Sequence, residues 1–362
     1  MTKDRKYYLD NIKTILILGL FVAHTCEIYH LKEGFYVEGD DTFVPTLVYN
    51  SLRSWYMSVL FFVAGLTTMY SLKKRTIKEY YIERCKRLLV PFCVGLFFWV
   101  PIQSYYTLRN HYDFAGNALD VYKHFFTTYT DGLYGYDGGF TPSHLWFLIY
   151  LMGIALISYP VIRYKKNYSS EDGLKVNVNW KNFAIFTLII YVVAYGTSDE
   201  SIGKFIAFFA VGILLYDDSK LYEFTMKNWK ILCVVGLVTN ICMAYMLIPM
   251  HDMNVWSVDY AWRRLVWAIS CTTAVFGTIG FGQRFLNKSN ALMKYLSSRS
   301  FAIYFIHMTV VISVGYYVLE YLNCGVGGQI GIIIGVSVVI TFALVEIVKR
   351  IPWLNGMLGM KR

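Results

Sequence analysis

Residues 12–28 read Ile12-Lys-Thr-Ile-Leu-Ile-Leu-Gly-Leu-Phe-Val-Ala-His24-Thr-Cys-Glu27-Ile28. An apolar run of this length is typical of a helix that crosses a lipid bilayer, which needs about 20 residues. Only Lys13, His24 and Glu27 interrupt the run with ionisable side chains. We therefore predict a first membrane-spanning helix here. Because no small-residue cleavage site follows it, we expect this helix to be retained rather than removed as a signal peptide.

Nine further apolar runs follow, and the composition agrees with them. The 362 residues are 56% hydrophobic and 16% charged, whereas an ordinary globular domain is about a quarter charged. This balance excludes a disordered regulator and a secreted disulfide scaffold. The predicted fold class is all-α, one polytopic integral membrane domain over residues 1–362 with about ten transmembrane helices. These helices are expected at residues 12–28, 52–69, 88–106, 145–162, 183–195, 202–216, 231–249, 265–281, 301–321 and 330–348.

The basic residues indicate the orientation of the chain in the membrane. The amino-terminal tail and every second connection carry 26 of the 34 Lys and Arg, and the opposite connections carry five. Cytoplasmic loops of membrane proteins carry such an excess, so both termini are expected to be cytoplasmic. The net charge of +10 then follows from topology, and nucleic acid is not an expected partner.

Ionisable residues within the first run suggest a site. Lys13 and His24 are eleven positions apart, close to three turns of about 3.6 residues, and therefore share one helix face. Asp10 lies one turn before Lys13 and Glu27 one turn after His24. Lys13 is interpreted either as an anchor that reaches the cytoplasmic interface or as a functional cation. His24 fits either a packing hydrogen bond or proton transfer, for which its ordinary pKa is well suited.

Arg84 and Arg87 lie three residues apart in the most basic loop, before the third run. Guanidinium forks bind phosphate through two hydrogen bonds, so this pair could hold an anionic group at the cytoplasmic surface. The alternative is a topology anchor or a contact with lipid headgroups. His307, early in the ninth run, fits a structural and a functional role equally. For Glu346 we expect an interfacial ion pair with Lys349 and Arg350.

The connection over residues 107–143 is the longest and lies on the predicted outer side. It interleaves aromatic residues, among them Tyr112, Tyr129 and Tyr136, with acidic ones such as Asp113 and Asp137. Rings that stack on sugars and carboxylates that accept from hydroxyls would make a carbohydrate surface. The alternative is an amphipathic helix over residues 120–129 that lies in the membrane interface.

Several kinds of chemistry lack their motifs in this chain. It has no phosphate-binding Walker loop, no nucleophile elbow and no zinc-binding helix motif, so ATP-dependent phosphoryl transfer and serine hydrolysis are not expected. Its seven cysteines form no CxxC pair or metal-binding spacing, and we interpret them as packing residues. No metal site is expected.

Five blocks, taken in order, resemble the acyltransferase-3 family of membrane acyltransferases. Lys13 and His24 match its signature of a basic residue, ten residues and a histidine on the first helix. The later blocks are Phe61-Phe-Val-Ala-Gly65, the basic loop that ends at Arg84-x-x-Arg87, His144-Leu-Trp146-Phe-Leu148, and residues 300–307. Within the family the chain is most similar to the succinyltransferases of osmoregulated periplasmic glucans. Lys13 stands where that branch more often has Arg, which keeps the charge and loses the bidentate fork.

The resemblance implies transfer of an acetyl or succinyl group from cytoplasmic acyl-CoA to a hydroxyl of an extracytoplasmic carbohydrate, in the cell membrane of a bacterium. His24 would be the general base and Glu27 would orient it. Lys13, Arg84 and Arg87 would hold the CoA phosphates. Acyl-CoA is then a donor substrate, and no bound cofactor is expected.

Further candidate site residues are Asp10, Trp146, Tyr304 and His307. Two other functions remain open on the sequence. A histidine with charged neighbours in a helix bundle is also typical of a proton-coupled transporter, although the chain shows no inverted repeat. A non-enzymatic membrane receptor would use the outer aromatic connection as its binding surface.

Overall fold

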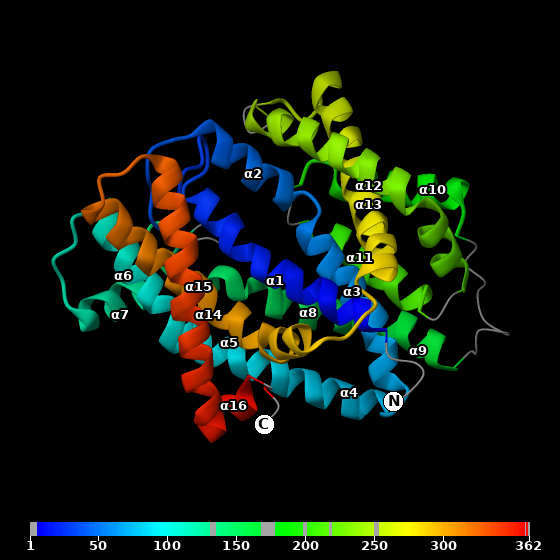
Figure 1. The fold of residues 1–362 in the computed structure, drawn as a ribbon, viewed down its shortest axis with the longest axis horizontal. Helices are drawn as coiled ribbons and strands as arrows, with labels where there is room; N and C mark the ends of the chain where they lie inside the picture. Colours follow the sequence, from blue (N-terminus) through cyan, green and yellow to red (C-terminus); the bar gives the residue numbers. More distant parts are fainter. Residues whose placement is uncertain are drawn as a thin grey trace. The chain divides into compact units, whose positions relative to one another are not determined.

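The structure is a computed structural model that describes residues 6–130, 135–167, 178–197, 201–216, 219–249, 253–358 and 360. Within these ranges the chain is helical, with an isolated bridge between Tyr129 and Phe140 and no assigned strand. The prediction of an all-helical fold is confirmed, and Figure 1 shows the arrangement of the helices.

The helices follow one another closely along the chain. They are α1 (Tyr7–Glu27), α2 (Phe43–Arg53), α3 (Tyr56–Leu72), α4 (Ile77–Arg84), η1 (Cys85–Leu89), α5 (Val90–Val94), η2 (Gly95–Trp99), α6 (Val100–His111), α7 (Ala118–Thr127), η3 (Ser143–Leu145), α8 (Trp146–Ile157), α9 (Tyr159–Asn167), α10 (Trp180–Ala194), α11 (Ile202–Leu214), α12 (Ser219–Leu247), α13 (Val258–Phe285), α14 (Ala291–Tyr321), α15 (Val326–Arg350) and α16 (Pro352–Met357).

Among the described residues, seven stretches are long and apolar enough to cross a membrane: Tyr7–Glu27, Phe43–Leu72, Ile77–His111, Ser219–Leu247, Val258–Phe285, Ala291–Tyr321 and Val326–Arg350. The pair Ser143–Ile157 and Tyr159–Asn167, bent by 55°, makes an eighth if it counts as one span. α10 and α11 have 15 and 13 residues. They rise only about 22 and 20 Å, against about 30 Å of hydrocarbon. Each predicted run is helical, while the count of ten spans and the cytoplasmic termini stay predictions.

The chain divides into two compact units. The first comprises residues 1–15, 50–82 and 153–294, and the second comprises residues 16–49, 83–152 and 295–362. The interpretation of the whole chain as one integral membrane domain stays a prediction.

The first unit is held together by close helix contacts. α12 and α13 lie side by side (Figure 1), and α3 packs on α11 through two facing glycines. A Cβ on Gly65 would lie 2.1 Å from the backbone oxygen of Phe209, and one on Gly212 would lie 2.4 Å from that of Phe62. In lipid, where burial of apolar surface gives helices little reason to associate, such small residues allow the backbone contact that stabilises the pair.

The second unit is built around α14. Within the apolar part of α14, 78% of the residues are buried, compared with 22% for α15. The side chain of Arg299 on α14 pairs with Glu346 on α15, and the Tyr295 hydroxyl donates to the same carboxylate at 2.8 Å. The ion pair of Glu346 therefore joins two helices instead of staying within the last turns of α15, where the sequence had suggested Lys349 and Arg350.

Two wide turns interrupt the helical stretch Ile77–His111 in the second unit. η1 and η2 are π-helical, and each precedes a proline, Pro91 at the start of α5 and Pro101 at the start of α6. A proline has no N–H to donate to the carbonyl four residues earlier. In a π turn, that carbonyl accepts instead from the N–H of the residue after the proline. Arg87 lies in the first of these turns.

The connection over residues 107–143 contains a helix, α7, close to the amphipathic helix that one of the two alternatives predicted. Its place in the membrane interface stays a prediction. Asn117 caps its amino terminus, since its side-chain oxygen accepts from Leu119 N at 2.8 Å. In turn, the Asp120 carboxylate accepts from Asn117 N at 2.9 Å. This reciprocal arrangement satisfies backbone groups that have no partner within the helix. Val121 and Phe125 are buried, while Leu119 and Tyr122 on other faces are exposed.

Candidate active site

His24 and Glu27 form a hydrogen-bonded pair in the last turn of α1. His24 Nδ1 lies 2.8 Å from Glu27 Oε2, and their side chains are 19% and 4% exposed. The other carboxylate oxygen, Oε1, accepts the Tyr49 hydroxyl of α2 at 2.7 Å. An ionised carboxylate only accepts, so the neutral form of His24 that bonds to it carries its hydrogen on Nδ1 and has Nε2 as an acceptor. A general base requires this tautomer.

A buried aromatic wall surrounds this pair. The ring of Phe35 stacks on that of His24 with centroids 6.2 Å apart and an interplanar angle of 13°. Tyr36 follows, and its ring meets that of Tyr136 edge to face at 5.1 Å. Tyr136 comes from the connection over residues 107–143, and its hydroxyl lies 3.4 Å from Glu27 Oε1. Only 4% of the Glu27 side chain is exposed, and this low exposure strengthens the interaction between imidazole and carboxylate.

The two tyrosines of this wall stay protonated over the physiological pH range. Burial raises the pKa of Tyr36 to about 12. Burial, and then the negative charge of Glu27, raises the pKa of Tyr136 well above its usual value. Both phenols therefore keep their hydrogen and do not serve as bases.

The rings of two more histidines, His307 and His144, lie in sequence next to the ring of His24. The ring centroids of His24 and His307 are 5.4 Å apart, and those of His307 and His144 are 5.5 Å apart. His307 lies on α14 and is fully buried, and its Nδ1 donates to the backbone oxygen of Tyr304 at 2.7 Å. Its Nε2 has no hydrogen-bond partner in the part of the chain that the structure describes. A buried acceptor without a partner is costly, so this nitrogen is available to a donor from outside the protein.

A polar network fixes His144. Its Nε2 lies 3.2 Å from the backbone oxygen of Phe305, to which it donates. Gln103 Nε2 lies 3.4 Å from His144 Nδ1 on the other side of the ring. Gln103 also donates to Thr309 Oγ1 at 2.8 Å and accepts from Ser143 Oγ at 2.5 Å. Ser143 has a φ of 49°, a left-handed conformation that L residues adopt at a cost of about 1–3 kcal/mol. The surrounding contacts hold this turn at the start of α8.

Two other predicted residues lie close to this network. The Tyr304 hydroxyl donates to the backbone oxygen of His144. Trp146, 6% exposed, packs edge to face on Tyr150 with centroids 4.9 Å apart. The structure therefore gathers His24, Glu27, Tyr304 and His307 within the second unit.

The predicted phosphate-binding residues are placed differently. Lys13 pairs with Asp10 at 3.1 Å in the first unit, with side chains 35% and 30% exposed. Arg84 ends α4, and Arg87 pairs with Glu83 at 2.8 Å. These contacts are compatible with either earlier interpretation, because an exposed ion pair is worth at most about 1 kcal/mol and an incoming phosphate can replace it.

Sequence reasoning missed four of the residues that complete this site: Phe35, Tyr36, Tyr49 and Gln103. Phe35 and Tyr36 lie on the loop between α1 and α2, Tyr49 lies on α2, and Gln103 lies on α6. Aromatic residues are frequent in this chain, with 31 Tyr and 25 Phe, so no sequence signal singles these out. In the described ranges, no group of three or more His, Cys, Asp or Glu is arranged to hold a metal ion.

Comparisons with known proteins point to one kind of enzyme. The acyltransferase-3 family model, described as an acyltransferase domain, matches residues 6–346. Relatives named glucans biosynthesis protein C from Salmonella heidelberg (strain SL476), Salmonella agona (strain SL483) and Salmonella dublin are each 21% identical, covering 99% of this chain and 95% of the relative. No solved structure gives a significant match. The chain therefore belongs to the acyltransferase-3 family, and it is a multi-pass membrane acyltransferase.

Proposed function

We propose that this protein transfers an acetyl or succinyl group from acyl-CoA to a hydroxyl of an extracytoplasmic saccharide. The observation that carries the proposal is the pair of His24 and Glu27, which leaves an unprotonated imidazole nitrogen in a buried aromatic site. The full-length similarity to glucans biosynthesis protein C supports a glucan or a related glycan as the acceptor.

In this mechanism His24 acts first as a general base and then as a general acid. The acceptor hydroxyl gives its proton to His24 Nε2 while its oxygen attacks the thioester carbonyl carbon. The tetrahedral intermediate then loses its carbon–sulfur bond, and the imidazolium returns the proton to the leaving thiolate. The products are an ester and free CoA. Glu27 stabilises the positive charge that His24 carries between the two steps.

His307 has a separate role in this proposal. Its partnerless Nε2 accepts a second hydroxyl of the saccharide, while the reacting hydroxyl lies on His24. Since the centroids of the two rings are 5.4 Å apart, we expect an acceptor with neighbouring hydroxyls to reach both histidines. His307 would then position the acceptor and take no proton from it.

We expect His307→Leu to raise the KM for a glucose disaccharide acceptor about tenfold, because a hydrogen bond to a buried group contributes about 1–2 kcal/mol. The KM for acyl-CoA should stay within twofold. His307→Gln offers an amide oxygen as acceptor and should recover part of the loss. Steady-state kinetics of the purified protein would measure these values. Equal losses for Leu and Gln, or a changed donor KM, would contradict the positioning role.

For the donor, we expect replacement of Arg84 and Arg87 together by Gln to raise the KM for acyl-CoA about tenfold or more, with little change for the acceptor. The physical reason is the loss of two guanidinium groups that can bind phosphate. Lys78→Gln and Lys86→Gln, combined, remove the same charge from the same basic loop and serve as the matched control. An equal effect of both double variants would assign the arginines to topology instead.

The function itself is tested by an inventory of base-labile esters on the envelope saccharides of a strain that lacks the protein. We expect one ester to disappear, as seen by mass spectrometry and NMR, and to return with the wild-type gene but not with His24→Ala. The inventory would identify the acyl group and its acceptor together. If every ester persists, the proposal fails and proton-coupled transport becomes the function to test.

A further inference from the structure

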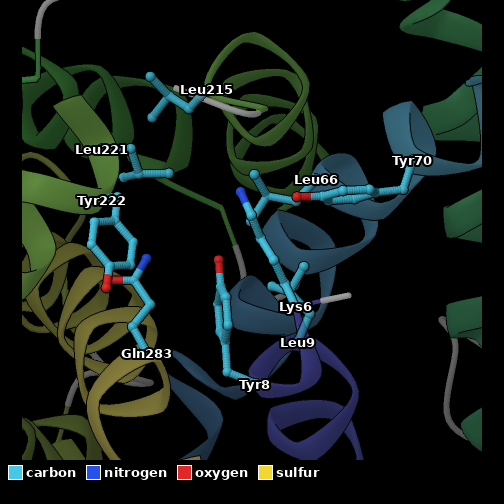
Figure 2. A pocket seen from close by; sticks show the side chains of 9 residues that line it. All are labelled: Lys6, Tyr8, Leu9, Leu66, Tyr70, Leu215, Leu221, Tyr222 and Gln283. Atoms are coloured by element: carbon cyan, nitrogen blue, oxygen red, sulfur yellow. The ribbon is translucent and has the colours of Figure 1, made fainter. Parts of the chain in front are cut away.

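A pocket opens in the first unit, at the place where α1 and α12 begin and α3, α11 and α13 end. Its walls come from α1, α3, α12 and α13 and from the residue that follows α11 (Figure 2). The pocket and its mouth hold about 290 Å³. Nothing in the proposed chemistry uses it. The lining residues are Lys6, Tyr8, Leu9, Leu66, Tyr70, Leu215, Leu221, Tyr222 and Gln283.

The pocket lies at one end of the helices of this unit. It is lined by the first turn of α1 and α12 and by the last turns of α3 and α13. All of these termini adjoin the connections that carry the excess of Lys and Arg. The positive-inside rule assigns this end to the cytoplasmic surface.

The polar groups of the pocket are mainly hydrogen-bond donors. Figure 2 shows the Lys6 ammonium, the Tyr8 hydroxyl and the Gln283 amide nitrogen turned toward the central space. Gln283 is 6% exposed, and its amide oxygen already accepts the Thr225 hydroxyl at 2.7 Å. The amide therefore turns its N–H groups toward the pocket, where one of them donates to the Tyr8 hydroxyl. None of the nine lining residues is Asp or Glu. This set suits an acceptor-rich, negatively charged group.

A second ammonium group lies beside the pocket. Lys6 Nζ is 5.6 Å from the centroid of the Tyr70 ring, and Lys73 Nζ is 5.7 Å from the same centroid. Lys73 also lies 5.3 Å from the ring of Tyr216. These cation–π contacts place both ammonium groups at this end of α3.

The other side of the pocket is apolar. Leu9, Leu66, Leu215 and Leu221 are each no more than 4% exposed in the folded chain. Together with the three tyrosine rings they suit a hydrocarbon or ring that is joined to the charged group. The enclosed part of the pocket is only about 20 Å³, and the 290 Å³ includes space that is open to solvent. Only a small group therefore enters the pocket, and the rest of the molecule lies at its mouth.

We propose that this pocket binds the phosphate-bearing end of an organic phosphate. Two sources carry that chemistry, the nucleotide end of CoA and the headgroup of an acidic phospholipid in the inner leaflet. The first source rests on the function proposed above, and the second does not. In both cases Lys6, Tyr8 and the Gln283 amide donate to phosphate oxygens while the leucines contact the attached body.

The first arm of the test measures CoA binding to the full-length protein in phosphatidylcholine nanodiscs by calorimetry. Lys6→Gln removes the ammonium group. Gln283→Glu keeps an acceptor for Thr225 and places a negative charge in the pocket. We expect each variant to raise the Kd for CoA at least fivefold and to leave binding of pantetheine, which has no phosphate, unchanged. Lys230→Gln removes an exposed charge from α12 outside the pocket and is the matched control.

The second arm measures phosphatidylglycerol retained by the same proteins in native mass spectra, with phosphatidylcholine as the neutral competitor. A fivefold loss in Lys6→Gln and Gln283→Glu, with CoA binding unchanged, assigns the pocket to lipid. Unchanged binding in both arms overturns the proposal. The outcome is separate from that of the acyltransferase proposal, because the ester inventory with His24→Ala does not depend on this pocket. Lys6 is partly exposed, so Lys6→Gln is expected to fold even if Gln283→Glu does not.

Discussion

Replacing His24 with alanine is expected to lower the rate of acyl transfer about 10²–10⁴-fold, the usual contribution of a positioned general base. Without the imidazole, the acceptor hydroxyl must attack with its proton still attached. The KM for acyl-CoA should change little, because in the proposed mechanism His24 contacts only the reacting groups. The measurement is the initial rate of ester formation by purified protein at saturating donor.

The variant must also be shown to fold. The side chain of His24 is 19% exposed, and its loss leaves Glu27 with the hydroxyl of Tyr49 as a partner, so we expect wild-type abundance in the membrane. His111→Ala, which removes a histidine of α6 outside the site, is the matched control and should keep full activity. A His24→Ala protein that fails to accumulate while His111→Ala accumulates would give the histidine a structural role. An abundant and fully active variant would remove it from the mechanism.

The fold could be predicted in outline because lipid imposes strong constraints on sequence. A chain that spans the bilayer must pair its backbone groups internally, so long apolar runs become helices. All ten predicted runs are helical. The breaks were harder to predict, since the 55° bend between α8 and α9 depends on packing with neighbouring helices. The π turns before Pro91 and Pro101 depend on the missing proline N–H together with that packing.

The candidate site could be predicted only where one helix determines it. His24 and Glu27 are three residues apart on α1, so helical geometry alone brings them into contact. Tyr49 and Tyr136 reach the same carboxylate from positions 22 and 109 residues farther along the chain. No periodicity relates such distant positions. The resemblance to a family pointed to His307 without indicating that its Nε2 lacks a partner, which required the packed structure.

Replacing Glu27 with glutamine is the more specific test of the site, and we expect it to lower kcat about 10²–10⁴-fold. The carboxylate accepts hydrogen bonds on both oxygens, from His24 Nδ1 and from Tyr49. An amide accepts on only one. If the amide oxygen stays on Tyr49, its N–H₂ group faces His24 Nδ1 and selects the tautomer with hydrogen on Nε2. That tautomer cannot remove a proton from the acceptor, and the variant also loses the negative charge that stabilises the imidazolium.

Tyr49→Phe separates these two effects from a general disturbance of the site. It removes one donor from Glu27 and leaves the charge and the tautomer of His24 intact, so we expect a loss of no more than about tenfold, the value of one hydrogen bond. Rates and thermal unfolding of both variants, measured side by side, give the comparison. Because Glu27 is 4% exposed, the amide also avoids burying a charge and should not lower the unfolding temperature by more than Tyr49→Phe does. A larger loss of rate for Tyr49→Phe than for Glu27→Gln would mean that Tyr49, and not the pair of His24 and Glu27, contacts the reacting groups.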